Sequence, residues 1–486
     1  MIKFYIAGLF FLIQTKVIGQ AWSNDFFVHR DGKDIVNGFG KKVKLDGFNL
    51  GGWLMWEGWI WGGGFTQEKV IYEKIKSKVG AGNAEAFQSN VYKNFITRSD
   101  IKKISEQCFN VVRIPFNHTI LEDDNSPFLY KQSGFDILDS VLRWCEEYNV
   151  YAVLDLHSAP GGQATLFTAD SDPIDLWSSL QNRERTVKLW KAIAERYKSR
   201  GIIAGYDLLN EPNTSQSKLL LDLYKNIIAE IRKVDTNHMI FIEGNDYARD
   251  FSSFDSLLDN NMAFEFHIYT FLNESVEEKL SAYENLSRRL NVPIWCGEWG
   301  ENTTEIVSST LKKLKLSNYN ISGTAFWTWK KQYKLIQFPC YYCYFGSFQW
   351  DKTTEWIGNN NSAEPTVAEV REGITHFLTY INSEKCVLNN SLYEILGNCT
   401  VAATLKGQSS SFEVFPNPTT DLLSVKNSDN NPFKVSIFDS VGKLVGEHSS
   451  SEHQLTIDVS KLSSGIYTVN ITSGNSQMAK KISLIE

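Results

Sequence analysis

Eight short apolar runs, separated by longer amphipathic stretches, constrain the fold of this chain more than any other feature. The runs cover 44–50, 110–116, 150–157, 202–211, 238–244, 262–269, 292–298 and 321–327. Each run is continuously apolar rather than alternating, as expected of parallel strands that are covered on both faces. Helical periodicity fills the gaps, for example over 133–148, 183–199, 216–233 and 303–315. Eight strands alternating with helices predict an α/β fold, a (β/α)₈ TIM barrel, over about residues 44–378.

A doubly wound open sheet is the competing fold for such a pattern. That fold is typical of nucleotide-binding proteins, in which a glycine-rich turn follows the first strand. No such turn follows the run at 44–50, so the closed barrel is favoured.

Other segments divide the chain around this barrel. Residues 1–19 read as a secretory signal peptide, because Lys3 precedes an apolar run too short to span a bilayer. We expect the barrel domain over 20–385 and a polar, irregular linker over 386–411. Residues 412–486 then alternate with period two, most clearly at 434–438, 453–459 and 466–471, which predicts a small antiparallel β-sandwich.

Composition narrows the class of ligand. The formal net charge is −7 and the sequence pI is about 5.8, which argues against nucleic acid because its binding needs a basic surface. A neutral ligand such as a polysaccharide fits better, and the 14 Trp and 20 Tyr residues suit stacking on flat ligand faces. After the signal peptide no apolar run is long enough to span a membrane, so we expect no transmembrane segment in the mature chain.

Seven cysteines leave at least one thiol unpaired. Cys108, Cys145 and Cys296 lie in apolar contexts and are expected to be small buried hydrophobes. Cys340 and Cys343 form a C-x-x-C motif, but without a second pair nearby a zinc site is not expected. A bridge between Cys386 and Cys399 is an even alternative to free thiols.

Polar side chains interrupt or end several apolar runs, whose carboxyl ends would form the catalytic face of a TIM barrel. They are Arg113, His157, Asn210, Glu211, His267, Tyr269, Glu298 and Trp327. Any one of them could be a solvated strand end or a core residue. Glu211 and Glu298 are different, because the fourth and seventh strands face each other across a barrel. Two unpaired acids aimed at one volume would be costly without a function.

The stretch GYDLLNEP (205–212) places one of these acids. We expect Pro212 to restrict Glu211 to an extended conformation, which fixes its carboxylate where the strand leaves the barrel. Asn210 could then hydrogen-bond a substrate hydroxyl.

Two carboxyl groups that flank one bond are the catalytic groups of glycoside hydrolysis. One must be protonated to assist the leaving oxygen, while the other must be ionised to attack the anomeric carbon. Arg113 could keep the nucleophile ionised. His157 and His267 lie on different strands without a metal-ligand motif, so we expect hydrogen bonding to substrate or carboxylate rather than a metal.

These motifs as a set resemble glycoside hydrolase family 5, the cellulase family. The resemblance covers about residues 40–380 and implies a (β/α)₈ barrel, a retaining mechanism and no metal or other cofactor. It implies Glu211 as acid/base and Glu298 as nucleophile, with six residues on substrate-binding positions: Arg113, His157, Asn210, His267, Tyr269 and Trp327. The segments 47–60, 154–163 and 205–213 are similar to the exo-β-1,3-glucanase side of the family. Residues 327–345 depart from that branch, which usually has an acidic residue soon after the Trp-Lys.

The C-terminal segment resembles the sorting domain of the type IX secretion system. FPNPTTDLLSV (415–425), LSSGIYTVNI (462–471) and the terminal KKISLIE carry the resemblance. It implies export across the outer membrane of a Gram-negative bacterium, with the secretion machinery as partner and release or surface anchoring as outcome. A carbohydrate-binding module is the alternative, but no tryptophan lies beyond residue 356.

Together these features predict a secreted retaining hydrolase of β-1,3- or β-1,4-glucans. A hydrolase of mannan or another β-glycan is one alternative. A catalytically inactive glycan-binding barrel is another, although both acids are present.

Overall fold

The structure of this protein is a computed structural model. It describes residues 27–165, 169–172, 175–270, 275–334, 338–359, 361–397, 412–416, 419–427, 431–439, 444–473 and 476–484. The chain forms two compact units, with the boundary between residues 398 and 399. The predicted signal peptide, 1–19, lies outside the described residues.

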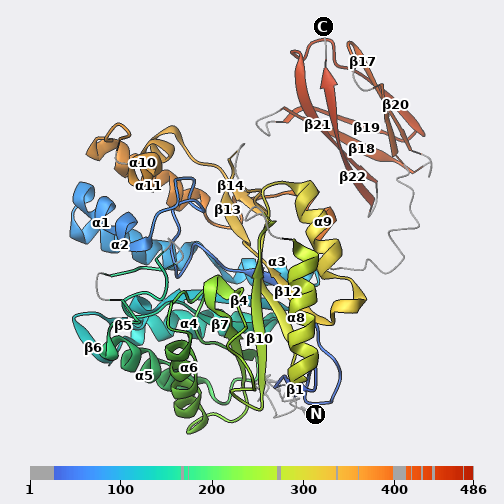
Figure 1. Cartoon of the computed structure of the whole chain (residues 1–486). Helices are drawn as coiled ribbons and strands as arrows, with labels where there is room; N and C mark the ends of the chain where they lie inside the picture. Colours follow the sequence, from blue (N-terminus) through green and yellow to red (C-terminus); the bar gives the residue numbers. More distant parts are fainter. Residues whose placement is uncertain are drawn as a thin grey trace, which may run out of the picture. The chain divides into compact units, whose positions relative to one another are not determined.

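Eight parallel strands close into a barrel in the first unit, which confirms the predicted fold (Figure 1). They are β3 (Gly47–Asn49), β4 (Val111–Asn117), β7 (Tyr151–Ser158), β8 (Ile203–Asp207), β9 (Met239–Glu243), β10 (Met262–Ile268), β11 (Ile294–Trp299) and β12 (Ile321–Phe326). Each predicted apolar run overlaps one of them. The strands pair in chain order, and β12 returns to β3.

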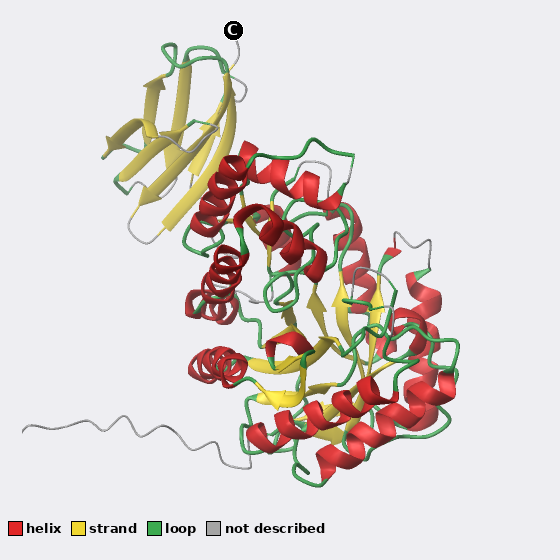
Figure 2. Ribbon diagram, turned by 90° about the vertical axis from the view of Figure 1, so that its left-hand side faces the viewer, coloured by secondary structure: helices red, strands yellow, loops and turns green. Residues whose placement is uncertain are grey.

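Helices surround the barrel (Figure 2). The helices of this unit are α1 (Glu68–Val79), α2 (Ala81–Asn94), α3 (Arg98–Glu106), α4 (Gln132–Tyr148), α5 (Leu180–Tyr197), α6 (Ser217–Arg232), α7 (Asn245–Ala248), α8 (Val276–Leu290), α9 (Thr304–Leu314), α10 (Phe348–Gly358), α11 (Val367–Tyr380) and α12 (Asn390–Leu396). Their apolar faces pack inward; α4, for example, buries Phe135, Leu138 and Leu142 and ends where Asn149 adopts a left-handed conformation.

Short strands and 3-10 turns lie outside the barrel in the described residues. They are β1 (His29–Asp31), β2 (Asp34–Val36), β5 (Glu122–Asp123), β6 (Ser126–Tyr130), β13 (Lys330–Gln332), β14 (Tyr342–Tyr344) and β15 (Val387–Leu388), with η2 (His118–Ile120) and η4 (Ser317–Tyr319). The hairpin of β5 and β6 follows β4, and β13 with β14 follows β12, so both lie in loops at the carboxyl ends of barrel strands.

The barrel interior is layered, because residues two apart on a strand point the same way. One layer is an apolar cluster that includes Val111, Val153, Phe241, Ala263 and Trp295. Two residues further along the same strands come Arg113, Asp155, Glu243, Glu265 and Gly297. A Cβ atom at Gly297 would lie 1.5 Å from Oε1 of Glu265, so only glycine leaves room for that acid. A charged layer therefore lies directly above an apolar one.

The first unit extends further than the sequence predicted. Residues 386–397, expected to begin a linker, contain β15 and α12 and belong to this unit. Leu392 and Leu396 of α12 are buried in its core, and the Asn389 side chain caps the helix. The expectation of a linker is therefore wrong over these residues, while 398–411 lie outside the described part.

The cysteines correct two expectations. Cys340 and Cys343 form a disulfide bond. Cys108 is also disulfide-bonded and lies in an exposed turn after α3 rather than in the core. Cys386 is a free thiol, so the bridge from Cys386 to Cys399 is wrong. Cys145 and Cys296 are buried free thiols, as expected.

The second unit is a small all-β sandwich, as predicted. One sheet contains β16 (Phe412–Phe415), β17 (Leu422–Asn427) and β20 (Gln454–Asp458); the other contains β18 (Phe433–Phe438), β19 (Leu444–Ser450), β21 (Gly465–Ser473) and β22 (Ser476–Leu484). All pairings are antiparallel. The buried cluster of this unit consists entirely of apolar and aromatic side chains.

Candidate active site

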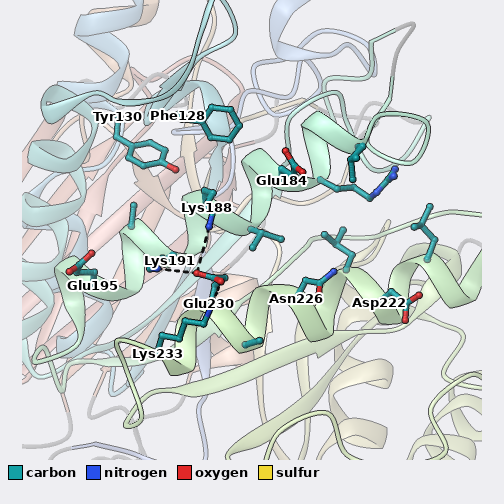
Figure 3. A pocket seen from close by; sticks show the side chains of 17 residues that line it. Phe128, Tyr130, Glu184, Lys188, Lys191, Glu195, Asp222, Asn226, Glu230 and Lys233 are labelled. Atoms are coloured by element: carbon teal, nitrogen blue, oxygen red, sulfur yellow. Dashed lines mark hydrogen bonds and ion pairs between the residues drawn. The ribbon is translucent and has the colours of Figure 1, made fainter.

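A groove of about 1050 Å³ lies outside the barrel between α5 and α6 (Figure 3). Glu230 crosses it to pair with Lys188 and Lys191. Neither of the predicted catalytic acids lines this groove, so its size does not mark the candidate site. The predicted residues gather instead at the carboxyl ends of the barrel strands.

Glu211 and Glu298 face each other across the barrel. One carboxylate oxygen of each lies within 4.8 Å of the other and of a ring nitrogen of His267. His267 Nδ1 lies 2.8 Å from Glu211 Oε1, and the Tyr269 hydroxyl donates to Glu298 Oε1 at 2.7 Å. This spacing is close to the roughly 5 Å of two carboxyl groups that act directly on one bond of a ligand, rather than the wider spacing that admits a water molecule between them.

Arg113 is the centre of the charged layer. Its guanidinium is fully buried and lies within 3.2 Å of carboxylate oxygens from five strands. These acids are Asp155, Asp207, Glu243, Glu265 and Glu298. Arg113 also donates to the Asn210 side-chain oxygen at 2.9 Å. One cation thus connects Glu298 to a set of acids buried beneath it.

A further acid, Glu57, lies in the loop after β3. It is almost fully buried, and its Oε1 is 3.8 Å from Nε2 of His157. The Trp59 indole donates to its other oxygen at 2.5 Å. His157 stacks on Trp327, with ring centroids 5.3 Å apart. These contacts place Glu57, His157 and Trp327 around the same space as the facing acids.

The two facing acids have opposite pKa shifts. Burial raises the pKa of Glu298, the nearby charge of Glu211 adds to this, and His267 and Arg113 oppose it. Burial also acts to raise the pKa of Glu211, but the hydrogen bond and charge of His267 outweigh it and lower the pKa. Burial alone would lower the pKa of His267, yet the charges of Glu243 and Glu298 raise it well above its usual value. The free site therefore holds a His267–Glu211 ion pair with a proton between them.

Burial raises the pKa of several of the surrounding acids. Burial raises the pKa of Asp155 to about 8 and that of Asp207 well above its usual value, against the attraction of Arg113. Burial likewise raises the pKa of Glu57 well above its usual value. His157 stays neutral, because burial and Arg113 lower its pKa to about 3. Shifts in this direction are those expected where several carboxyl groups share one buried region.

The same groups could hold a metal ion by type and spacing. Glu211, His267 and Glu298 form one such cluster, and Glu243, Glu265 and His267 form another. The absence of metal and cofactor expected from the sequence stays a prediction.

The local conformation of Glu211 differs from the sequence-based expectation. Its φ angle is 46°, in the left-handed region, so the extended conformation expected before Pro212 is wrong. The Glu211 N–H donates to Glu243 Oε2 at 2.5 Å, and His267 holds its carboxylate. These tertiary contacts override the local preference, and backbone strain of about 1–3 kcal/mol is typical of such positions in functional sites.

Comparison with known proteins agrees with this geometry. Residues 66–333, more than half of the chain, match the family model described as cellulase (glycosyl hydrolase family 5). This chain belongs to glycosyl hydrolase family 5.

Similar curated proteins carry several activity names. A β-xylosidase from Phanerodontia chrysosporium is 33% identical over 55% of this chain and 60% of that protein. Endoglucanase C from Acetivibrio thermocellus is 31% identical over 38% of this chain and 53% of that protein. A probable glucan 1,3-β-glucosidase A from Aspergillus fumigatus is 29% identical, over 40% and 49% respectively. The chain thus spans about half to three-fifths of the length of these relatives.

The second unit has its own match. Residues 413–485 match the family model described as a secretion system C-terminal sorting domain, which indicates export to the cell surface or the medium. Among the described residues, no helix combines the length and apolar character that crossing a bilayer requires.

The family 5 barrel brings all eight predicted site residues to one end of the strands. Sequence reasoning missed Glu57, Asp155, Asp207, Glu243 and Glu265. Four of these lie inside apolar runs, and two of the four come two residues before a predicted site residue: Asp155 before His157, and Glu265 before His267. These two acids could have been found from the sequence. Each lies inside an apolar run, on the same face of the strand as the polar residue at its end.

Proposed function

We propose that this chain is a secreted retaining glycoside hydrolase that cleaves β-1,3- or β-1,4-glucans by double displacement. The observation that carries the proposal is the facing pair of Glu211 and Glu298, with carboxylate oxygens within 4.8 Å of each other. Retaining glycosidases need about this separation, because the second carboxylate attacks the sugar directly.

Glu298 is the proposed nucleophile. Tyr269 and Arg113 both donate hydrogen bonds to it, and such bonds favour the ionised form of a carboxyl group. Its attack on the anomeric carbon forms a covalent glycosyl-enzyme bond as the bond to the leaving oxygen breaks.

Glu211 is the proposed acid/base. The proton held between His267 and Glu211 reaches the leaving oxygen through the Glu211 carboxyl group. Glu211 then takes a proton from the water molecule that hydrolyses the glycosyl-enzyme bond. Asn210 supports substrate binding, because its buried side-chain nitrogen has no hydrogen-bond acceptor among the described residues.

The pKa shifts predict the pH dependence of kcat/KM. Activity requires an ionised Glu298 and a proton on the His267–Glu211 pair. Since the pKa of Glu298 is raised, activity should rise with pH through a value above that of an ordinary glutamate. Since the pKa of His267 is raised, activity should fall only above the ordinary histidine range. A His267→Gln variant should lose activity at lower pH than the wild type.

The decisive experiment combines a substrate screen with product stereochemistry. Purified protein is incubated with laminarin, carboxymethyl-cellulose and mannan, and early product is followed by proton NMR. We expect hydrolysis of a β-glucan with retained β configuration. An inverted product would contradict the mechanism, and binding without hydrolysis that Glu298→Gln leaves unchanged would identify an inactive glycan-binding barrel.

A second substrate class has support from one relative. The β-xylosidase shares the highest identity among the relatives described above, so xylo-oligosaccharides belong in the screen. Faster hydrolysis of these than of gluco-oligosaccharides would assign the chain to β-xylosides with the same catalytic pair.

For export, we propose the type IX secretion system of a Gram-negative bacterium. The match of residues 413–485 to a sorting domain supports this, as does the separate compact unit they form. Deletion of 412–486 should abolish delivery to the surface or medium while activity of the cytoplasmic protein persists. Normal delivery of the truncated protein would contradict a sorting role.

A further inference from the structure

Lys331 is a buried lysine next to the candidate site. It lies on β13, four residues after Trp327, and only 2% of it is exposed. Its neighbour Lys330 is equally buried but pairs with Asp100 at 2.9 Å. No carboxylate among the described residues lies within ion-pair distance of Lys331. A buried ammonium group without a counter-ion is costly, so its position needs another explanation.

Two contacts hold the Lys331 ammonium group. It donates to the carbonyl oxygen of Phe338 at 2.8 Å, and it lies 5.2 Å from the ring centroid of Trp59. The second distance is within the range of a cation–π interaction, which strengthens in a desolvated environment. Trp59 and Phe338 also contact each other, with ring centroids 5.1 Å apart. Lys331 thus connects the loop after β3 to the loop after β12.

Trp59 links this lysine to the candidate site through its hydrogen bond to Glu57. Its indole nitrogen donates to Glu57, whose other oxygen is 3.8 Å from His157. The acids of the catalytic pair act electrostatically on Glu57, since the charges of Glu298 and Glu211 help to raise its pKa. The orientation of the Trp59 ring therefore fixes where the Glu57 carboxyl group lies relative to the pair.

A disulfide bond and strand pairing constrain the chain around Lys331. The Cys340–Cys343 disulfide closes part of this segment just after Phe338, and Lys331 is paired in register with Cys343 between β13 and β14. The Phe338 contact of Lys331 thus lies just before a covalently closed turn whose Cys343 pairs with Lys331.

We propose that Lys331 is a positioning residue of the sugar site, which holds Trp59 and, through it, the Glu57 carboxyl group beside the catalytic pair. The inference rests on the proposed hydrolase function for its kinetic readout. Burial lowers the pKa of Lys331 to about 7, with Lys334 contributing, which agrees with an amine that has no anionic partner.

The test compares Lys331→Met, which keeps an unbranched apolar side chain, with Lys331→Arg, which restores a cation. Lys334→Met is the matched control, because Lys334 is a partly exposed lysine three residues away that pairs with Asp351. Kinetics are measured on the substrate selected by the screen, and each variant is checked for its melting temperature. Lys331→Met should lower kcat/KM about five- to twentyfold, mainly through KM, and Lys331→Arg should restore it to within about threefold. Lys334→Met should match the wild type.

A second readout does not depend on turnover. Proteins labelled with 5-fluorotryptophan are compared by fluorine NMR, and the Trp59 signal is assigned with Trp59→Phe. Lys331→Met should shift or broaden that signal, while Lys334→Met leaves it unchanged. An unchanged Trp59 signal, or wild-type kcat/KM in Lys331→Met, would overturn the inference. An inactive wild type with a shifted Trp59 signal would instead count against the proposed hydrolase function alone.

Discussion

The interiors of the two units are built on opposite principles. Among the described residues, the sandwich core is mainly apolar, with Thr419 and Asn427 as its buried polar residues. Buried and exposed residues alternate along strands such as β16 and β17. The upper barrel interior contains one arginine, two histidines and seven acids that are all buried. Those acids are Glu57, Asp155, Asp207, Glu211, Glu243, Glu265 and Glu298. An apolar core needs only packing, whereas a charged core is retained for chemistry at some cost in stability.

This difference predicts which properties of the protein a substitution changes in each unit. In the barrel, changes to charge should alter activity, pH dependence and stability together, because the groups share one network. In the sandwich, changes to packing should alter stability alone. Four experiments test this contrast, from the largest expected effect to the smallest.

Removal of the proposed catalytic acids should have the largest effect. Glu298→Gln should lower kcat by at least about ten-thousandfold, as loss of a nucleophile typically does. Glu211→Ala should lower it by about two to four orders of magnitude, the usual contribution of acid/base assistance. Initial rates on the preferred glucan measure both effects. Near-wild-type rates in either variant would refute the assignment.

Arg113→Met should both inactivate and destabilise the protein. The substitution leaves Asp207, Glu243 and Glu298 without their shared cation, and loss of one partner of a buried ion pair costs about 3–5 kcal/mol. Urea unfolding followed by tryptophan fluorescence measures this cost. Asp139, which pairs with Arg196 nearer the surface, provides a control: Asp139→Asn should cost less than about 1 kcal/mol. Equal costs would show that the buried charges are not coupled.

Leu423→Ala should destabilise the sandwich without affecting catalysis. Leu423 is fully buried in the apolar core, and such a truncation costs about 2–5 kcal/mol. We expect faster proteolysis of the C-terminal unit and reduced export, with unchanged kcat/KM. A fall in kcat/KM comparable to the loss of stability would contradict the separation of the two interiors.

The last experiment concerns the slope of stability against pH rather than stability at one pH. The pKa of Asp155 is about 8 in the folded protein and about 3.8 in the unfolded chain, so the native state binds more protons between these values. Stability must then fall as pH rises from about 4 to about 8. Asp155→Asn, which stays neutral, should flatten this slope in thermal unfolding between pH 5 and pH 8. A slope identical to that of the wild type would show that Asp155 does not take up a proton on folding.

Much of the fold was predictable because apolar runs and period-two alternation reflect burial directly. The eight runs identified the eight barrel strands, and the residues at their ends, such as His157 and Glu298, identified the site. Motifs in the barrel segment indicated the family, and motifs in the C-terminal segment indicated the sorting domain. The roles of the site residues stay predictions until variants are measured.

The rest depended on contacts between distant segments. Asp207 and Glu243 interrupt apolar runs. Nothing near them in the sequence explains their burial, because their partner Arg113 lies on another strand. Glu57 lies in a loop whose course no periodicity predicts. The conformation of Glu211 is set by Glu243 and His267 rather than by Pro212. The free thiol of Cys386 and the disulfide of Cys108 likewise follow from three-dimensional placement, not from spacing.

The position of Arg113 has a consequence for how this barrel forms. Its guanidinium contacts carboxylates from β7, β8, β9, β10 and β11. Of these strands only β7 pairs directly with β4, and the others reach Arg113 through the barrel interior. In an incompletely closed barrel these acids would repel one another without a shared counter-ion. We therefore expect ring closure and assembly of the candidate site to occur together. A maturing polypeptide should pass from inert to fully competent without a stage of intermediate activity.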